Sequence, residues 1–325
     1  MPRSRLVRAL IDYHHADLAE SLHLLLTDRL GIDLYIPVGP EWYEAGVWQF
    51  GRWTWGDDRL ARQFLNRDAV ERDSAHPERL HNVITYPEAQ NLDWDYVIAS
   101  VPDNYAGYHA FARQHGSKFV IQAGNTNQYI AWELEPLVLN SSEMPIAGRG
   151  VTYHQEFSLA DFAYSPAESQ VIGSFVNCMD RMPCWGFLDE ARRLMPERTF
   201  RIHGIDGEHG NVKPTRDVGT LMRSYGWGWH DKITGDGFGH VIFNWAAVGR
   251  PLIGHASHYD GKLGGPLWED RVTCIDLDRH SVREVAGMID GLDNVTMGRA
   301  IRDRFEELVD YEAEAEQIRA LLVDE

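Results

Sequence analysis

The sequence has 325 residues, of which 44% are hydrophobic and 25% are charged, and its formal net charge is −18 at pH 7. This is a globular composition, and the length favours two domains of about 150 residues each. The negative charge argues against a protein that coats DNA or an anionic membrane, because it would be repelled by both. The sequence contains no run of about 18 consecutive apolar residues, the length that a membrane span needs.

In the first half of the chain, strand-like runs alternate with helical patterns. The predicted elements, in chain order, are a strand at 5–11, a helix at 16–31, a strand at 33–39, an irregular Trp-rich region at 40–80, a strand at 95–102, a helix at 104–116, a strand at 118–125 and extended pieces at 136–142 and 151–157. This alternation predicts a parallel sheet with helices on both faces.

The pattern restarts after a predicted linker at 159–169. The predicted elements there are a strand at 168–177, a helix at 184–195, a strand and turn at 200–207, a short strand at 225–232, a helix at 240–249, strands at 250–257 and 272–278, and three helical segments between 280 and 323. We therefore predict an α/β protein of two doubly wound, Rossmann-like domains, residues 1–160 and 161–325, facing a cleft. The last helix is a candidate to pack back on the N-terminal domain. Such sheets bind ligands at the carboxyl ends of their strands.

A glycine-rich turn precedes one of these helices in the stretch GDGFGHVIFNWAAVGRPLI, residues 235–253. A strand is expected to end near His230, and the helix to begin near Gly239. The first N–H groups of a helix lack intrahelical partners and lie at the positive end of its dipole, and glycines let a ligand approach them. The pattern predicts a phosphate-binding turn without the Walker lysine. The alternative is a plain turn, a capped helix and a strand that starts at Pro251.

This stretch resembles the signature of the GT-B glycosyltransferases, above all the large retaining family with a Glu-Gly-Phe-Gly motif. Here Asp236 is followed by Gly-Phe-Gly, Asn244 stands eight positions after it, and Gly-Arg-Pro precedes a hydrophobic strand. The resemblance covers most of 170–310, whereas the N-terminal half matches only in its βαβ pattern. Asp236 and Asn244 stand where the family has glutamates that contact the donor sugar and the nucleotide ribose. An asparagine can still hydrogen-bond a ribose hydroxyl, but it carries no charge.

The resemblance implies a nucleotide-sugar donor, with a UDP-sugar as the expected co-substrate, and neither a further cofactor nor a metal. Charge that builds on the departing diphosphate then needs cationic side chains and a helix N-terminus. Arg181 and Lys232 are the best matches for the family's cations, and the alternative for each is a solvated surface residue. The other predicted donor-binding residues are Gly204, His230, Asp236, Gly237, Phe238, Gly239, His240 and Asn244.

The first strand–helix junction reads DYHHADLAESL, residues 12–22, and lacks the G-x-G-x-x-G of a dinucleotide enzyme. Instead, His14, His15 and Asp17 follow the first strand, where GT-B enzymes face the acceptor. A base there would deprotonate the acceptor hydroxyl. Asp103, at another strand end, ranks second as a base. The alternative is that Asp17 and Asp103 cap helices and that the histidines are loop residues.

Three other patterns concern aromatic residues, D-x-D triplets and cysteines. The aromatic residues of 41–55 would stack on sugars or bases, or pack on the sheet edge. The D-x-D triplets at 93–95 and 276–278 are interpreted as turns and caps. Cys178, Cys184 and Cys274 have neither disulfide nor zinc-site spacing, which favours a reducing cytoplasm.

The resulting prediction is a metal-independent glycosyltransferase that moves a hexose or pentose to a hydroxyl acceptor. One alternative is a phage-type enzyme, active in the host cytoplasm, that glycosylates hydroxymethylated DNA bases. It would need a basic patch that includes Arg3, Arg5 and Arg8. The fold would also suit a nucleotide-sugar 2-epimerase, which would turn over without an acceptor, and a binding protein that neither transfers nor hydrolyses the donor.

Overall fold

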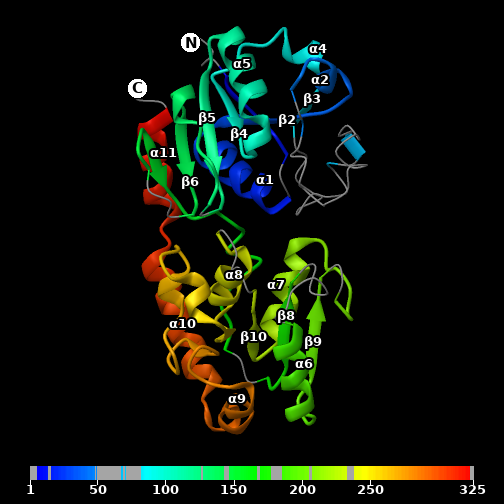
Figure 1. Ribbon diagram of the computed structural model, residues 1–325, viewed down its shortest axis with the longest axis vertical. Coiled ribbons are helices and arrows are strands. Elements are labelled where there is room, and N and C mark those ends of the chain that lie inside the picture. The colour runs from blue at the N-terminus through cyan, green and yellow to red at the C-terminus, as the bar shows by residue number, and fades with distance from the viewer. Residues whose placement is uncertain are drawn as a thin grey trace. The chain divides into compact units, whose positions relative to one another are not determined.

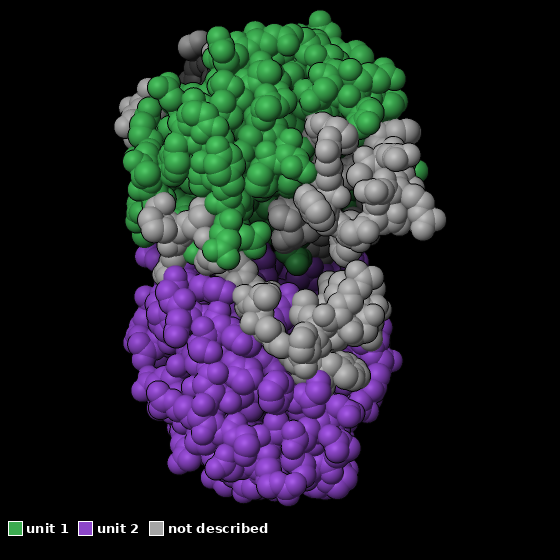
Figure 2. Space-filling model, viewed as in Figure 1, with its two compact units in different colours: residues 1–157, 311–325 green, residues 158–310 purple. Residues whose placement is uncertain are grey.

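The computed structural model describes residues 6–13, 16–47, 49, 67–68, 70, 82–125, 127–142, 146–166, 169–176, 185–204, 207–232 and 238–322. The chain forms two compact units (Figure 2). Unit 1 comprises residues 1–157 and 311–325, and unit 2 comprises residues 158–310. The boundary at 157/158 compares with 160/161 from the sequence, and the last helix belongs to unit 1 rather than unit 2.

The described strands of unit 1 form one parallel sheet in the order β3-β2-β1-β4-β5-β6-β7 (Figure 1). They are β1 (Val7–Ile11), β2 (Ile32–Pro37), β3 (Asn82–Ile84), β4 (Tyr96–Ala99), β5 (Lys118–Ala123), β6 (Leu137–Asn140) and β7 (Gly150–Thr152). The helical elements are α1 (Ala16–Leu22), the π-helix η1 (His23–Arg29), α2 (Glu41–Glu44), α4 (Tyr86–Ala89), η2 (Pro102–Asn104), α5 (Tyr105–His115), η3 (Trp132–Leu134) and α11 (Tyr311–Leu322). The chain reverses its direction of growth between β1 and β4, so the sheet is doubly wound.

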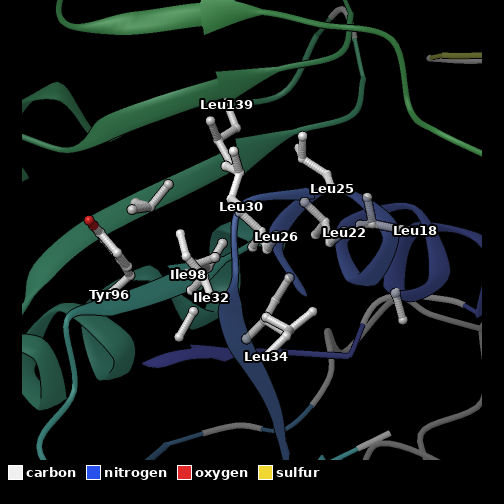
Figure 3. Packing of buried hydrophobic residues seen from close by; sticks show 14 of the residues in the cluster. Leu18, Leu22, Leu25, Leu26, Leu30, Ile32, Leu34, Tyr96, Ile98 and Leu139 are labelled. Atoms are coloured by element: carbon white, nitrogen blue, oxygen red, sulfur yellow. The ribbon is translucent and has the colours of Figure 1, made fainter. Parts of the chain in front are cut away.

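Leucines of the α1–η1 segment make up much of the core on one face of this sheet. Figure 3 shows Leu22, Leu25 and Leu26 on this segment, turned toward Ile98 and Leu139 on the strands. All five side chains are buried. Truncating one such leucine to alanine typically costs about 2–5 kcal/mol, so this face holds α1 and η1 against the sheet.

Helix α11 is anchored to unit 1 by polar contacts as well as by its apolar face. Glu314 accepts a hydrogen bond from the His154 backbone N–H at 2.8 Å and pairs with its ring Nδ1 at 2.6 Å. Arg29 holds Glu156 through two bonds of 2.7 and 2.6 Å and also pairs with Glu312. His154 and Glu156 therefore serve to seat the last helix.

The described strands of unit 2 form a second parallel sheet in the order β12-β11-β10-β8-β9. They are β8 (Ile172–Phe175), β9 (Phe200–His203), β10 (Trp227–Trp229), β11 (Leu252–Gly254) and β12 (Cys274–Asp276). The helical elements are α6 (Trp185–Leu194), α7 (Thr215–Ser224), α8 (His240–Val248), η5 (Ala256–Tyr259), η6 (Gly265–Leu267), α9 (Val282–Met288), η7 (Ile289–Gly291) and α10 (Asn294–Leu308). This order is the other common doubly wound arrangement, with its switch point between β8 and β10.

Most predicted elements of both units are present. Strand β3 and helix α4 were not predicted, α2 lies in the region predicted to be irregular, and three further elements differ. The helix predicted at 16–31 is an α-helix that continues as a π-helix and ends at Arg29. The strand predicted at 225–232 is shorter, because the chain leaves the sheet after Trp229. Helix α7 was not predicted, since its sequence TRDVGTLMRS contains a glycine and few apolar residues. The described residues include no helix that is both long and apolar enough to cross a membrane.

Candidate functional site

The carboxyl ends of the unit 2 strands bring together polar residues from distant parts of the sequence. His230, Asp231 and Lys232 follow β10, His255 follows β11, and Asp278 lies just beyond β12. Parallel strands end at a common edge of the sheet, so side chains that follow adjacent strands converge there. The switch point between β8 and β10 lies on the same edge, which makes it the expected ligand site of this unit.

The helix predicted after the glycine turn follows β10 and so begins at this edge, whereas residues 233–237 of the turn lie outside the described residues. Helix α8 begins at His240, and Gly239 is its N-cap with φ of +80°, a left-handed conformation that favours glycine. No described side chain caps the helix at this position. The ring of Phe238 stacks on that of Phe243 with centroids 4.5 Å apart, which joins the residue before the N-cap to the first turn of α8. The helix therefore begins with backbone N–H groups that suit an anion.

The described donor-binding candidates have different environments. Lys232 is half-buried, and His230 is buried at the end of β10. Asn244 is buried in α8, and its Oδ1 accepts no hydrogen bond from the described chain. Gly204 follows β9 with φ of +132° and donates its N–H to the Gly210 carbonyl at 3.0 Å. Arg181, Asp236 and Gly237 lie outside the described residues.

An acid–histidine cluster at the same edge was not singled out from the sequence. Asp231 Oδ1 lies 3.8 Å from His255 Nε2 and 3.9 Å from His258 Nδ1. Burial raises the pKa of Asp231 to about 6, although His255 and His230 oppose the shift. The available signal was that Asp231 and His255 stand within two residues of the ends of buried strands, because such positions line ligand sites.

Asp278 completes the cluster from the neighbouring strand. Its Oδ1 contacts His255 Nδ1 at 2.9 Å, and its Oδ2 accepts the Ser257 N–H at 2.7 Å. Burial opposes ionisation of Asp278, but the hydrogen bonds from Ser257 and His255 outweigh it and lower its pKa to about 2. Asp278 is thus a carboxylate that fixes the orientation of the His255 ring.

In unit 1, a buried carboxylate organises the switch point between β1 and β4. Asp12 accepts hydrogen bonds from the Ser100 N–H at 2.7 Å, the Ser100 hydroxyl at 2.6 Å, the Val101 N–H at 3.1 Å and the Asn104 amide at 2.7 Å. Burial raises its pKa to about 6, against these four bonds. Asp12 was not predicted as a site residue, because the prediction placed the site at His14, His15 and Asp17. Its hydrogen bonds to Ser100, Val101 and Asn104 nevertheless fix the loop after β4.

The predicted bases of unit 1 are only partly described. His14 and His15 lie outside the described residues. Asp17 is exposed in the first turn of α1, and Asp103 is exposed within η2. Asp103 does not cap α5, because the N-cap of that helix is Asn104, which makes no side-chain cap bond.

The remaining sequence patterns are structural where they are described. Trp42 is buried and donates its indole N–H to the Ile84 carbonyl at 3.0 Å, so it packs against the sheet; residues 48 and 50–55 are outside the described chain. Asp95 and Asp276 accept backbone N–H groups at strand ends, as expected of turns and caps. Within the described residues, no group of three or more His, Cys, Asp or Glu side chains could hold a metal ion.

Two other predicted groups are described only in part. Arg8 of the possible basic patch is half-buried, whereas Arg3 and Arg5 lie outside the described residues. Cys274 is buried in β12, and Cys178 and Cys184 lie outside the described residues as well.

Comparison with known proteins gives a fold but no sequence relative. No protein-family model and no curated protein matches the sequence. The structure of HepE from Anabaena in complex with UDP and glucose is 14% identical, with a TM-score of 0.66 over 99% of this chain and 100% of that one. Sucrose-phosphate synthase from Thermosynechococcus elongatus is 13% identical (TM-score 0.63, 98% of both chains), and a glycosyltransferase from Rickettsia africae is 12% identical (TM-score 0.63, 99% and 100%). These matches run along the whole chain and agree with the two doubly wound sheets, so the protein has the GT-B glycosyltransferase fold.

Proposed function

We propose that this protein is a glycosyltransferase that uses a nucleotide sugar, with a UDP-sugar as the donor, and transfers the sugar to a hydroxyl acceptor without a metal ion. The observation that carries the proposal is the glycine-led N-terminus of α8, which follows β10 and Lys232 in the chain at the carboxyl edge of the unit 2 sheet. Full-length similarity to a structure that holds UDP and glucose supports the same ligand class.

The chemistry of sugar transfer fits these groups. The bond from the sugar to the diphosphate breaks with negative charge building on the departing phosphate oxygens. Backbone N–H groups at the start of α8 and the Lys232 ammonium can stabilise that charge without reorganising. Asn244, whose Oδ1 is buried and accepts no hydrogen bond within the described chain, is proposed to accept one from a ribose hydroxyl.

On the acceptor side, the loop that Asp12 holds and the residues that follow β1 are the proposed location of the acceptor hydroxyl. Asp12 itself is committed to Ser100, Val101 and Asn104. It is therefore proposed as a positioning residue, and the base is proposed among His14, His15 and Asp17, as inferred from the sequence.

A thermal-shift panel of UDP, GDP, ADP, TDP and their sugar conjugates tests the donor proposal. A ligand that binds the folded state raises the melting temperature. We expect stabilisation by the UDP family in wild type, and its loss in Lys232→Ala. Lys213→Ala is the matched control, because Lys213 is an exposed lysine of the same unit.

The outcomes separate the candidate functions. No stabilisation by any nucleotide contradicts a donor site in unit 2. A UDP-sugar that binds and is converted without an acceptor indicates an epimerase. A UDP-sugar that binds but is neither transferred nor hydrolysed across an acceptor panel indicates a binding protein.

A further inference from the structure

Asp231 is a buried carboxylate that no described residue satisfies. Its side chain is 1% exposed, and neither carboxylate oxygen accepts a hydrogen bond from any described residue. A buried polar group without a partner costs free energy, and an ionised one costs more. The other two carboxylates in comparable positions, Asp12 and Asp278, have backbone N–H donors. Asp231 therefore has hydrogen-bonding capacity that a bound molecule could use.

Two imidazole rings lie within 4 Å of this carboxylate without hydrogen-bonding to it. His255 Nε2 and His258 Nδ1 lie 3.8 and 3.9 Å from Asp231 Oδ1, which is too far for a direct hydrogen bond. His258 Nδ1 also makes no hydrogen bond within the described chain. A hydroxyl oxygen that approaches from the side can bridge two polar atoms at this separation, with ordinary hydrogen-bond distances of about 2.8 Å to each. A hydroxyl suits it chemically, since it donates to the carboxylate and accepts from an imidazole N–H.

The cluster is connected to the proposed donor site through the backbone and through η5. Asp231 immediately precedes Lys232 in the sequence. His258 and Tyr259 are consecutive in η5, and a Cβ atom on Gly239 would lie 3.4 Å from the Tyr259 ring. The segment that carries His258 thus packs against the glycine that leads α8. His255 and His258 are 15% and 18% exposed, so the imidazoles are the solvent-facing part of the cluster.

We propose that Asp231, with His255 and His258, forms a subsite that binds a hydroxyl group of the donor's sugar and so selects which sugar is carried. This inference rests on the proposed function, and it goes further by assigning the glycosyl part of the donor, not the nucleotide, to this cluster. Asp231 contacts no leaving-group atom in this assignment, so its role is specificity rather than stabilisation of the departing diphosphate.

Binding measurements with UDP and a panel of UDP-hexoses, made by calorimetry on the full chain, test the subsite. The quantity of interest is the ratio of the Kd for UDP to the Kd for the best UDP-hexose. Asp231→Asn is the test variant, because it keeps the shape and removes the charge. Asp260→Asn is the matched control, since Asp260 is an exposed acid that follows η5 directly.

We expect Asp231→Asn to leave the Kd for UDP within about twofold and to lower the ratio about tenfold or more, which corresponds to the loss of a charged hydrogen bond. Asp260→Asn should change neither quantity. At pH 7.5, the melting temperature of Asp231→Asn without ligand should equal or exceed that of wild type, because a buried carboxylate that accepts no hydrogen bond has been removed.

Three results would overturn the subsite. One is a wild type that binds UDP-hexoses no more tightly than UDP, which removes the sugar contact but leaves the proposed function intact. Another is an unchanged ratio in Asp231→Asn. A third is a markedly lower melting temperature in that variant, which would make Asp231 structural. If wild type binds neither UDP nor any UDP-hexose, the proposed function fails as well, and this pattern is distinct from the other three.

Discussion

Replacing Arg250 with methionine should destabilise unit 2 more than any change to a surface arginine. Arg250 is fully buried in the Gly-Arg-Pro segment that follows α8. Its guanidinium donates to the carbonyls of Ser165 (2.5 Å), Arg223 (2.5 Å), Tyr225 (2.6 Å) and Val248 (2.7 Å). It also donates to the Gly249 carbonyl at 3.0 Å and the Ser165 hydroxyl at 2.9 Å. One side chain therefore joins the start of the unit, the turn before β10 and the end of α8.

The magnitude follows from what methionine leaves behind. Methionine fills the volume of the arginine stem but donates no hydrogen bond, so the acceptors of three segments lose their partner. Two of these acceptors are the Val248 and Gly249 carbonyls at the end of α8, which have no hydrogen-bond partner within the helix. Burial lowers the pKa of Arg250 to about 10, so the side chain is still charged at pH 7. Because the cost of burying that charge offsets part of the bonding, we expect a net loss of about 3–5 kcal/mol in the free energy of unfolding.

Urea unfolding of the full chain, followed by tryptophan fluorescence, measures this loss, because Trp227, Trp229 and Trp245 are buried in unit 2. Arg250→Lys should lose less, since an ammonium still donates three bonds. Arg283→Met is the control: Arg283 is exposed on α9, and such changes stay within about 0.5 kcal/mol. A loss under about 1 kcal/mol in Arg250→Met would refute the reasoning, because it would mean that water replaces the guanidinium at no cost.

Three further predictions concern the two switch points. Asp12→Asn places an amide N–H₂ among four hydrogen-bond donors, so the free energy of unfolding of unit 1 should fall by roughly 1–3 kcal/mol. This loss would appear as a lower urea midpoint, and an unchanged midpoint would contradict the role given to Asp12. Gly239→Ala would place an alanine in a left-handed conformation, with its Cβ 3.3 Å from the Ile242 side chain. We expect it to lower the free energy of unfolding by about 1–2 kcal/mol and to weaken UDP binding. Gly287→Ala in α9 is the control, because a Cβ there has no atom within 4 Å, and it should change neither quantity. Finally, the raised pKa of Asp231 means that the folded state holds its proton between pH 3.8 and about 6 while the unfolded chain does not. Wild type therefore loses stability as pH rises through that window. The melting temperature of Asp231→Asn, taken relative to that of wild type, should rise between pH 5 and pH 7.5. A constant difference between the two melting temperatures across that range counts against the raised pKa.

Local patterns in the sequence were sufficient to predict the fold class and the helix that begins after Gly239. The strand before His230, the helix after Gly239 and the closing helices lie close to where hydrophobic periodicity and glycine placed them. These features depend on residues a few positions apart, and backbone preferences such as the positive φ of Gly239 act at that range.

Which side chains meet was decided by tertiary structure. Asp231, His255 and Asp278 converge only because β10, β11 and β12 are neighbours in the sheet, and no local pattern specifies strand order. The Gly-Arg-Pro segment matched a family motif, yet two of the six hydrogen bonds of Arg250 go to Ser165, a residue of the predicted linker 85 positions earlier. The last helix joins unit 1 because its buried face, which includes Ile318, completes the core beside Tyr153. In each case a polar or apolar group finds its partner across a long stretch of sequence, and only the folded chain brings the two together.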